Sequence, residues 1–446
     1  MVAAGRGPNG PKVTRLQRAS LRSWKPARAV ALLALIAYGL RGTVLNGFLA
    51  SLDTNRFRGD FSAALFDMNW WCRNGELVDL NYGILFTYLN KAVLAFHNPF
   101  SCDFTTTYRV DIEQFLFVIT GVNILCAGLA IYLVSTLFNL TWSERLFITA
   151  LWLLDSHLRY SFAVTAFPEF LELVLILACL TLMRSEDKFP HFLSGALLAI
   201  AIMVKLAPAL FIPLLFYRRK YTFQRLYSFI GTLGLILLSA MVFLKISIIS
   251  IISQLVPVMA VRMDHALDDN FRSFSFGLIR IFNLSIDSKI THFLYGVSVS
   301  VLLVILFGTV LYTFANRRLS QDERLDHDKR YLLLIGLYFA LLPLINIAHG
   351  HTFLFLLPAY ASIYKAIKYI HNKSKQKIYI LVGMLVYIWI SQSLLSSLTK
   401  HLSIPDLPRI FHEDGVATFG LVLLCVALVR NYEIDNRSLQ SEGSDF

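Results

Sequence analysis

The chain has 446 residues, of which 56% are hydrophobic and only 16% are charged. An average soluble domain carries about 25% charged residues, and the mean hydropathy of +0.59 indicates more apolar surface than a soluble fold of this length could bury. The net charge of +12 comes from short basic clusters between apolar runs. Membrane topology explains that placement, so we predict no nucleic-acid partner.

Apolar runs long enough to cross the roughly 30 Å hydrocarbon core recur along the chain. No strand-like alternation recurs at a spacing of about ten residues, so helices are expected to satisfy the backbone in lipid. We therefore predict an all-α polytopic membrane bundle of about 12 transmembrane or half-membrane helices, with both termini in the cytoplasm. The clearest runs are 115–138, 162–183, 227–244, 293–314 and 378–398.

The first 28 residues are basic and contain no acid, which is typical of a cytoplasmic tail before a first anchor. That anchor would deliver a long polar segment to the outer face. The predicted organisation is a basic tail at 1–28, one membrane domain at 29–430 with large outer loops at 51–111 and 257–290, and a polar cytoplasmic tail at 431–446.

Further along, we predict that 146–154 leads to an outer turn at 155–161, and that 162–183 returns as one continuous span. Two later apolar stretches, 192–217 and 331–364, have basic residues on both flanks. Because basic flanks favour the cytoplasm, each stretch is predicted to fold back as a helical hairpin.

Each predicted hairpin contains a sequence that interrupts a helix. The first is broken at Lys205-Leu206-Ala207-Pro208, since proline removes a backbone donor and disfavours helix just before it. The second is interrupted at Asn346-Ile347-Ala348-His349-Gly350-His351, and its two histidines would lie at the outer tip. Polar residues on the outer side are therefore the first candidates for a functional site.

Asp60, with Asp67 seven residues later, lies in the first outer loop. A carboxylate there could act as a general base on an attacking hydroxyl, although an exposed loop acid is the simpler interpretation. His349 and His351 could move protons or hold a phosphate; their spacing of two favours a structural role over a metal pair.

Basic and acidic residues near the predicted helix ends are further candidates. Lys205 could hold an anionic phosphate as a point charge or extend to the interface. Arg272 and Arg280 could hold phosphate better, because guanidinium groups match phosphate oxygens. Glu169, beside Pro168, is an acid inside the predicted membrane region.

The five cysteines show no metal-ligand spacing. Cys72 and Cys102 share the first outer loop, so both a disulfide and two free thiols remain open. No phosphate-binding loop, catalytic elbow or zinc motif occurs, and we predict neither a metal nor a cofactor.

Several short motifs, taken in order, resemble a known family. They are Gly59-Asp60-Phe61-Ser62-Ala63-Ala64, the small-residue run 193–201 leading to Lys205-Leu206-Ala207-Pro208, Asn270-Phe271-Arg272-Ser273-Phe274, and Pro343 followed by His349 and His351. This order is similar to the GT-C superfamily of membrane glycosyltransferases, and most similar to glycosyltransferase family 87, the polyprenol-phosphate-mannose-dependent mannosyltransferases. In this chain Gly350 separates the two histidines, which are adjacent in the family pattern.

The resemblance implies inverting, metal-independent transfer of a hexose, with mannose favoured, from a polyprenyl- or dolichyl-phosphate sugar. The acceptor would be a hydroxyl of a lipid-linked or surface glycan on the extracytoplasmic side. It implies Asp60 as the base, helped or replaced by His351 or His349, with Arg272 and Lys205 stabilising the departing phosphate. The other substrate-binding candidates are Arg280, Asp67, Glu169 and Asn270.

The same resemblance favours a multi-pass protein of a bacterial plasma membrane over one of the endoplasmic reticulum. Two other functions stay open. Lys205 and Glu169 beside a broken helix are also typical of a secondary transporter or flippase. A non-catalytic subunit of a membrane glycosylation complex is the third possibility.

Overall fold

The computed structural model describes residues 30–45, 109–163, 166–205, 207–216, 221–243, 274–285, 324–342, 350–370, 372–391 and 414–443, with isolated positions between 49 and 308. Every regular element within these residues is helical, which confirms the all-α prediction. The first described segment is an apolar helix, Val30–Gly42, overlapped by a π-helical turn, η1 (Leu40–Leu45).

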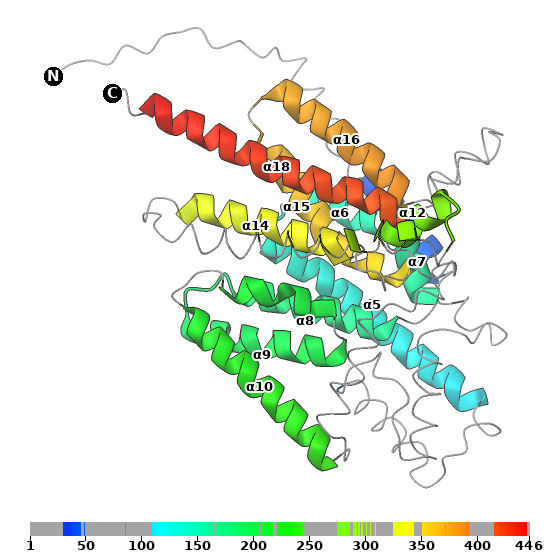
Figure 1. Ribbon diagram of the computed structural model, residues 1–446. Helices are drawn as coiled ribbons and strands as arrows, with labels where there is room; N and C mark the ends of the chain where they lie inside the picture. The colour runs from blue at the N-terminus through cyan, green and yellow to red at the C-terminus, as the bar shows by residue number, and fades with distance from the viewer. Residues whose placement is uncertain are drawn as a thin grey trace, which may run out of the picture.

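The helices form two groups that pack side by side (Figure 1). In one group α8 packs against both α5 and α9, and α9 packs against α10. In the other, α14 packs against α15 and α18, and α16 packs against α18. The bounds are α5 (Arg109–Leu137), α8 (Phe167–Leu182), α9 (Lys188–Val204), α10 (Thr222–Phe243), α14 (Arg324–Leu341), α15 (Leu356–Lys368), α16 (Lys373–Ser391) and α18 (Asp414–Gly443).

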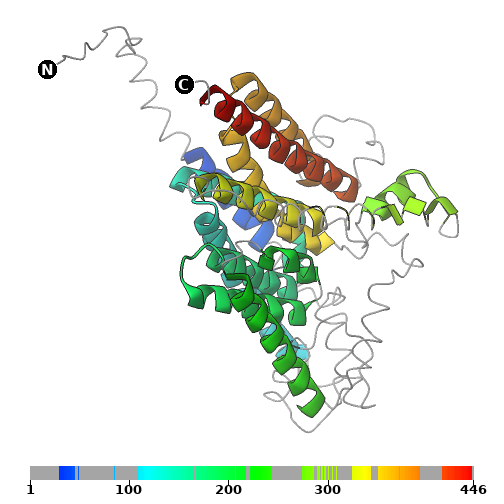
Figure 2. The same ribbon diagram turned by 60° about the vertical axis from the view of Figure 1, so that its left-hand side comes forward.

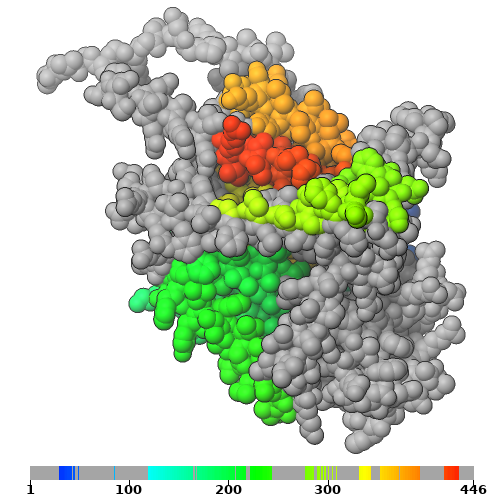
Figure 3. Space-filling view, in the orientation of Figure 1, coloured from blue at the N-terminus to red at the C-terminus, as the bar shows by residue number. Residues whose placement is uncertain are grey.

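Two described helical stretches, Ile119–Leu137 and Thr222–Phe243, are long and apolar enough to cross a membrane. Helix α10 forms an outer edge of the bundle (Figures 2 and 3). It exposes large apolar side chains along its length, including Tyr227, Leu235 and Phe243, as a lipid-facing helix would. The total number of spans and the side of the termini stay predictions.

The first predicted hairpin is confirmed. Helix α9 ends at Val204, and Lys205 has an extended backbone with φ −156° and ψ 151°. The 3-10 helix η3 (Ala207–Phe216) then brings the chain back, because the Tyr221 ring stacks on His191 near the start of α9, with centroids 4.1 Å apart.

A glycine allows α10 to lie directly against α9. A Cβ atom at Gly195 would come within 2.1 Å of the Arg225 carbonyl oxygen, so no other residue fits without moving a helix. One turn further on, the Ser228 hydroxyl donates a hydrogen bond to the Phe192 carbonyl. Small residues commonly permit such close approach in membrane bundles.

The second predicted hairpin is also confirmed by contacts between α14 and α15. The Ser362 hydroxyl donates to the Leu332 carbonyl at 2.9 Å, and the Phe339 and Phe355 rings stack with centroids 6.5 Å apart. The two helices are therefore antiparallel. A short 3-10 helix, η9 (Gly350–Phe355), leads into α15.

The prediction of an outer turn followed by one continuous span is wrong. Residues 155–161 lie largely within a helix of their own, α7 (Ser156–Ala163), after α6 (Trp142–Leu153). Helix α8 begins only at Phe167, with Pro168 in its first turn, a position that proline favours because its missing N–H is not needed there. At the other terminus, α18 continues as helix through the predicted polar tail to Gly443.

Candidate functional site

Buried polar groups gather at two opposite ends of the described bundle. Arg184 follows α8, and its Nη1 donates a hydrogen bond of 2.5 Å to the Leu137 carbonyl at the end of α5. Helices α5 and α8 therefore both end here and, since they pack together, run in the same direction. We call this the Glu144 end, and we call the opposite end, where α8 starts and α9 breaks, the Lys205 end.

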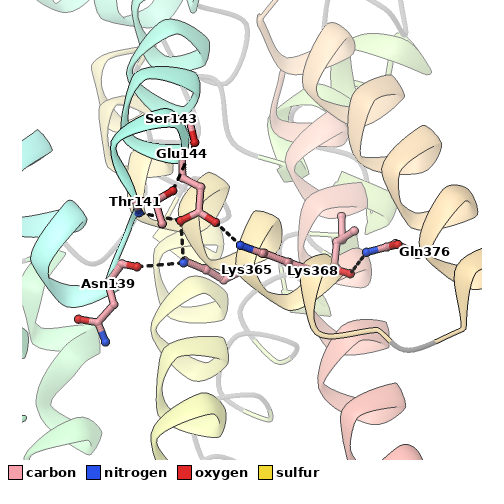
Figure 4. Close-up of polar contacts among 8 residues, drawn as sticks. Asn139, Thr141, Ser143, Glu144, Lys365, Lys368 and Gln376 are labelled. Atoms are coloured by element: carbon pink, nitrogen blue, oxygen red, sulfur yellow. Dashed lines mark hydrogen bonds and ion pairs between the residues drawn. The ribbon is translucent and has the colours of Figure 1, made fainter. Parts of the chain in front are cut away.

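At the Glu144 end, one buried carboxylate has a full set of partners (Figure 4). Glu144 accepts bonds from Lys365 Nζ at 2.8 Å, Lys368 Nζ at 2.7 Å and the Thr141 amide at 2.8 Å. Lys365 also donates to the Asn139 carbonyl at 3.0 Å. The cluster ties the turn between α5 and α6 to α15.

The charge of Glu144 is stabilised by these partners. Burial alone raises the pKa of Glu144, but the bonds from Lys365, Lys368 and the Thr141 amide outweigh it and lower the pKa to about 2. The group is therefore an anion at any physiological pH. The cluster therefore fits a structural role, in which it holds the α5–α6 turn against α15.

At the Lys205 end, the structure brings together two residues singled out from the sequence. Glu169 lies in the first turn of α8, and Lys205 Nζ forms an ion pair with its Oε1. The Glu169 side chain is 1% exposed and that of Lys205 is 21% exposed. The extended backbone after α9 places the lysine where its side chain can reach α8.

A second carboxyl group lies one turn further along α8. Glu172 is 1% exposed, and neither of its carboxyl oxygens has a hydrogen-bond partner among the described residues. Lys205 and Glu169 are both close enough to interact electrostatically with it. An unsatisfied buried carboxyl group is costly, so Glu172 calls for an explanation beyond packing.

Helix α5 contributes polar side chains at the same level. Asn123 and Thr120 are buried, and within the described part of the chain their side-chain polar atoms also have no partner. They lie on the buried stripe of α5, which packs against α8. Because α5 and α8 end near the same point, Asn123 lies level with the first turns of α8, which carry Glu169 and Glu172.

A third polar group lies beside η9, the helix that contains His351. Asp155 accepts hydrogen bonds from the Tyr360 hydroxyl and the His157 amide, both at 3.0 Å. The His157 ring stacks on Phe353 of η9 with centroids 4.2 Å apart. Trp152 Nε1 donates to the Leu354 carbonyl at 3.3 Å. Helix η9 is thereby held against α7, and it also contacts α8.

The other predicted site residues are placed in part. Arg280 is buried on α12 (Phe274–Ile281), which packs against α18, and the backbone of His351 lies in η9. The described residues contain no group of three side chains able to hold a metal. Outside the described residues lie Asp60, Asp67, His349, Asn270, Arg272, Cys72 and Cys102.

Sequence reasoning missed Glu172, Asn123 and Thr120. A usable signal was present for Glu172, because an acid within an apolar helix is by default a functional candidate. Its spacing of three from Glu169 places both on one helical face. Nothing in the sequence marks Asn123 or Thr120, whose significance depends on α5 packing against α8.

The sequence model of glycosyltransferase family 87 matches residues 104–344. The match covers more than half of the chain and includes α5 to α10, α12 and α14. The class of protein is therefore a GT-C type glycosyltransferase, and the chain belongs to glycosyltransferase family 87. No curated protein matches the chain at a significant level.

Proposed function

We propose that the protein transfers a hexose, with mannose favoured, from a polyprenyl- or dolichyl-phosphate sugar to a hydroxyl of a lipid-linked or surface glycan. The observation that carries the proposal is the family match over residues 104–344. The exposed apolar side chains of α10 and the buried polar groups at the Lys205 end support a site reached by a lipid-linked substrate. We place it in the bacterial plasma membrane, with the site on the extracytoplasmic side.

The proposed reaction is one displacement at the anomeric carbon, with inversion. The acceptor oxygen forms a bond to that carbon as the bond to the phosphate oxygen breaks. Asp60 takes the acceptor proton, with His351 or His349 as helper or alternative base. Arg272 and Arg280 stabilise the departing lipid phosphate, because guanidinium groups hold phosphate oxygens in pairs.

The test is sugar transfer by the full-length protein in nanodiscs, with radiolabelled polyprenyl-phosphate mannose and a lipid-glycan extract from the source organism. We expect Asp60→Asn to lower the rate at least about 100-fold, since a general base contributes that much. Asp103→Asn, in the same predicted outer loop, is the matched control and should retain activity. Undiminished transfer by the Asp60 variant would remove this residue from the role.

Transport of a lipid-linked or polar substrate is a second candidate function. The observation that favours it is the Lys205–Glu169 ion pair beside the broken α9 helix, since interrupted helices build ion and substrate sites in transporters. Flux of labelled lipid-linked sugar across proteoliposomes, in the absence of any transfer with several lipid-phosphate sugars, would favour transport over catalysis.

A further inference from the structure

The charges at the Lys205 end do not suit a phosphate group. Among the described residues the cluster contains one ammonium group, on Lys205, and two carboxyl groups, on Glu169 and Glu172. Lys205 is already engaged by Glu169. An incoming anion would therefore have to compete with Glu169 for this ammonium group. The cluster therefore favours a neutral polar ligand.

The unpartnered atoms supply both hydrogen-bond donors and acceptors. Glu172 presents two carboxyl oxygens, Asn123 an amide oxygen and an amide NH₂ group, and Thr120 a hydroxyl. A hexose carries several hydroxyl groups, each able to donate and accept. Carboxyl and amide groups together satisfy such hydroxyls without requiring a net charge on the ligand.

The position of these atoms fits a substrate more closely than a packing defect. All three side chains are at most 2% exposed, and each buried group without a partner costs about 1–3 kcal/mol. The packing of α5 on α8 places them toward the end where α8 begins and α9 breaks, and η9 also contacts α7 and α8. Buried polar groups without partners are expected at this end if a bound ligand supplies the missing hydrogen bonds.

From the charge balance, the unpartnered atoms and their position, we propose that Glu172, Asn123 and Thr120, with the Lys205–Glu169 pair, form a subsite that binds the hydroxyl groups of a hexose. The inference rests on the proposed function. It assigns the Lys205 cluster to the sugar and leaves the lipid phosphate to Arg272 and Arg280. Donor and acceptor both carry hexoses, and the experiment distinguishes them.

The experiment measures binding of two probes to the full-length protein in nanodiscs: polyprenyl-phosphate mannose and bare polyprenyl phosphate. Glu172→Leu and Asn123→Leu remove the hydrogen-bonding groups while keeping a side chain of similar size. If the subsite holds the donor hexose, each variant binds the mannose lipid about tenfold more weakly, the loss of one good hydrogen bond, and binds the bare phosphate unchanged. If it holds the acceptor hexose, donor binding is unchanged and the acceptor KM rises by a similar factor.

Matched controls lie on the same two helices. Thr181 on α8 and Ser135 on α5 donate to carbonyls of their own helices, Leu177 and Ile131, at 2.7 Å and 2.6 Å. Thr181→Val and Ser135→Ala should leave the binding of both probes and the acceptor KM unchanged. They establish that a polar-to-apolar change in these helices does not by itself impair binding.

Three results would overturn the inference. In the first, Glu172→Leu and Asn123→Leu change neither donor binding nor the acceptor KM, while the wild type binds and transfers mannose; the proposed function then survives. In the second, Glu172→Leu or Asn123→Leu changes the binding of bare polyprenyl phosphate, which would assign the cluster to the phosphate and not to the sugar. In the third, the wild type does not bind the mannose lipid, and the proposed function fails with the inference.

Discussion

Each end of the bundle has a lysine paired with a buried glutamate, but the two ends differ in how many hydrogen-bond partners their carboxyl groups have. Glu144 accepts hydrogen bonds from two ammonium groups and one backbone amide. At the Lys205 end one ammonium group serves Glu169, and Glu172 has no hydrogen-bond partner among the described residues. Both ends contain buried carboxyl groups, but of Glu144, Glu169 and Glu172 only Glu144 has hydrogen-bond partners among the described residues for both of its carboxyl oxygens.

This difference separates two uses of a buried polar cluster. A fully satisfied cluster rigidifies the fold, whereas a partly satisfied one lowers stability unless something else completes it. The Glu144 end therefore fits a structural tie between the α5–α6 turn and α15. The Lys205 end fits a site that a ligand completes, and the two can be told apart by experiment.

The largest stability effect is expected at the Glu144 end. Glu144→Gln leaves Lys365, whose side chain is 9% exposed, buried without its carboxylate, and breaking such a pair costs about 3 kcal/mol. Thermal unfolding in nanodiscs should show a clear fall in Tm. Transfer per folded molecule should stay at the wild-type value; a selective loss of activity without a change in Tm would contradict the structural role.

The opposite sign is expected at the Lys205 end. Glu172→Leu removes a buried carboxyl group that has no described partner, so the folded state should gain about 2 kcal/mol, and Asn123→Leu about 1 kcal/mol. Both variants should unfold at a higher temperature than the wild type in the absence of substrate. A large fall in Tm would show that these groups are satisfied within the protein.

The smallest effect is a pH dependence confined to the Glu144 end. The pKa of Glu144 in the folded protein is about 2, below the ordinary value of 4.5. Its contribution to stability is thus complete well above pH 4.5 and is lost as the pH falls toward 2. Between pH 5 and pH 3.5 the wild type should lose about 1 kcal/mol relative to Glu144→Gln. Parallel pH profiles of Tm for the two proteins would contradict this linkage.

The sequence predicts the two hairpins because their signals are local. Proline and the basic flanks suffice to mark the break at Lys205-Leu206-Ala207-Pro208. The helix boundary before Phe167 was missed, since an apolar run does not reveal where a helix stops and restarts. Pro168 was the signal for that boundary, because proline is common in the first turn of a helix.

The composition of the candidate site was less predictable. Lys205 and Glu169 were each singled out, but their pairing depends on how α9 packs against α8 and on the extended backbone at Lys205. Asn123 gains significance only because α5 and α8 run in the same direction and pack together. Helix packing brings together side chains that are far apart in the sequence, and a local sequence pattern does not predict that packing.

The Lys205–Glu169 pair has a fixed polarity. Glu169 lies in the first turn of α8, where exposed backbone N–H groups carry partial positive charge, and Lys205 follows the last residue of α9, where carbonyl groups carry partial negative charge. Each helix end thus favours the charge that it holds. Exchanging the residues, as Glu169→Lys with Lys205→Glu, keeps the pair but sets both charges against their helix ends. The double variant should therefore remain less stable than the wild type.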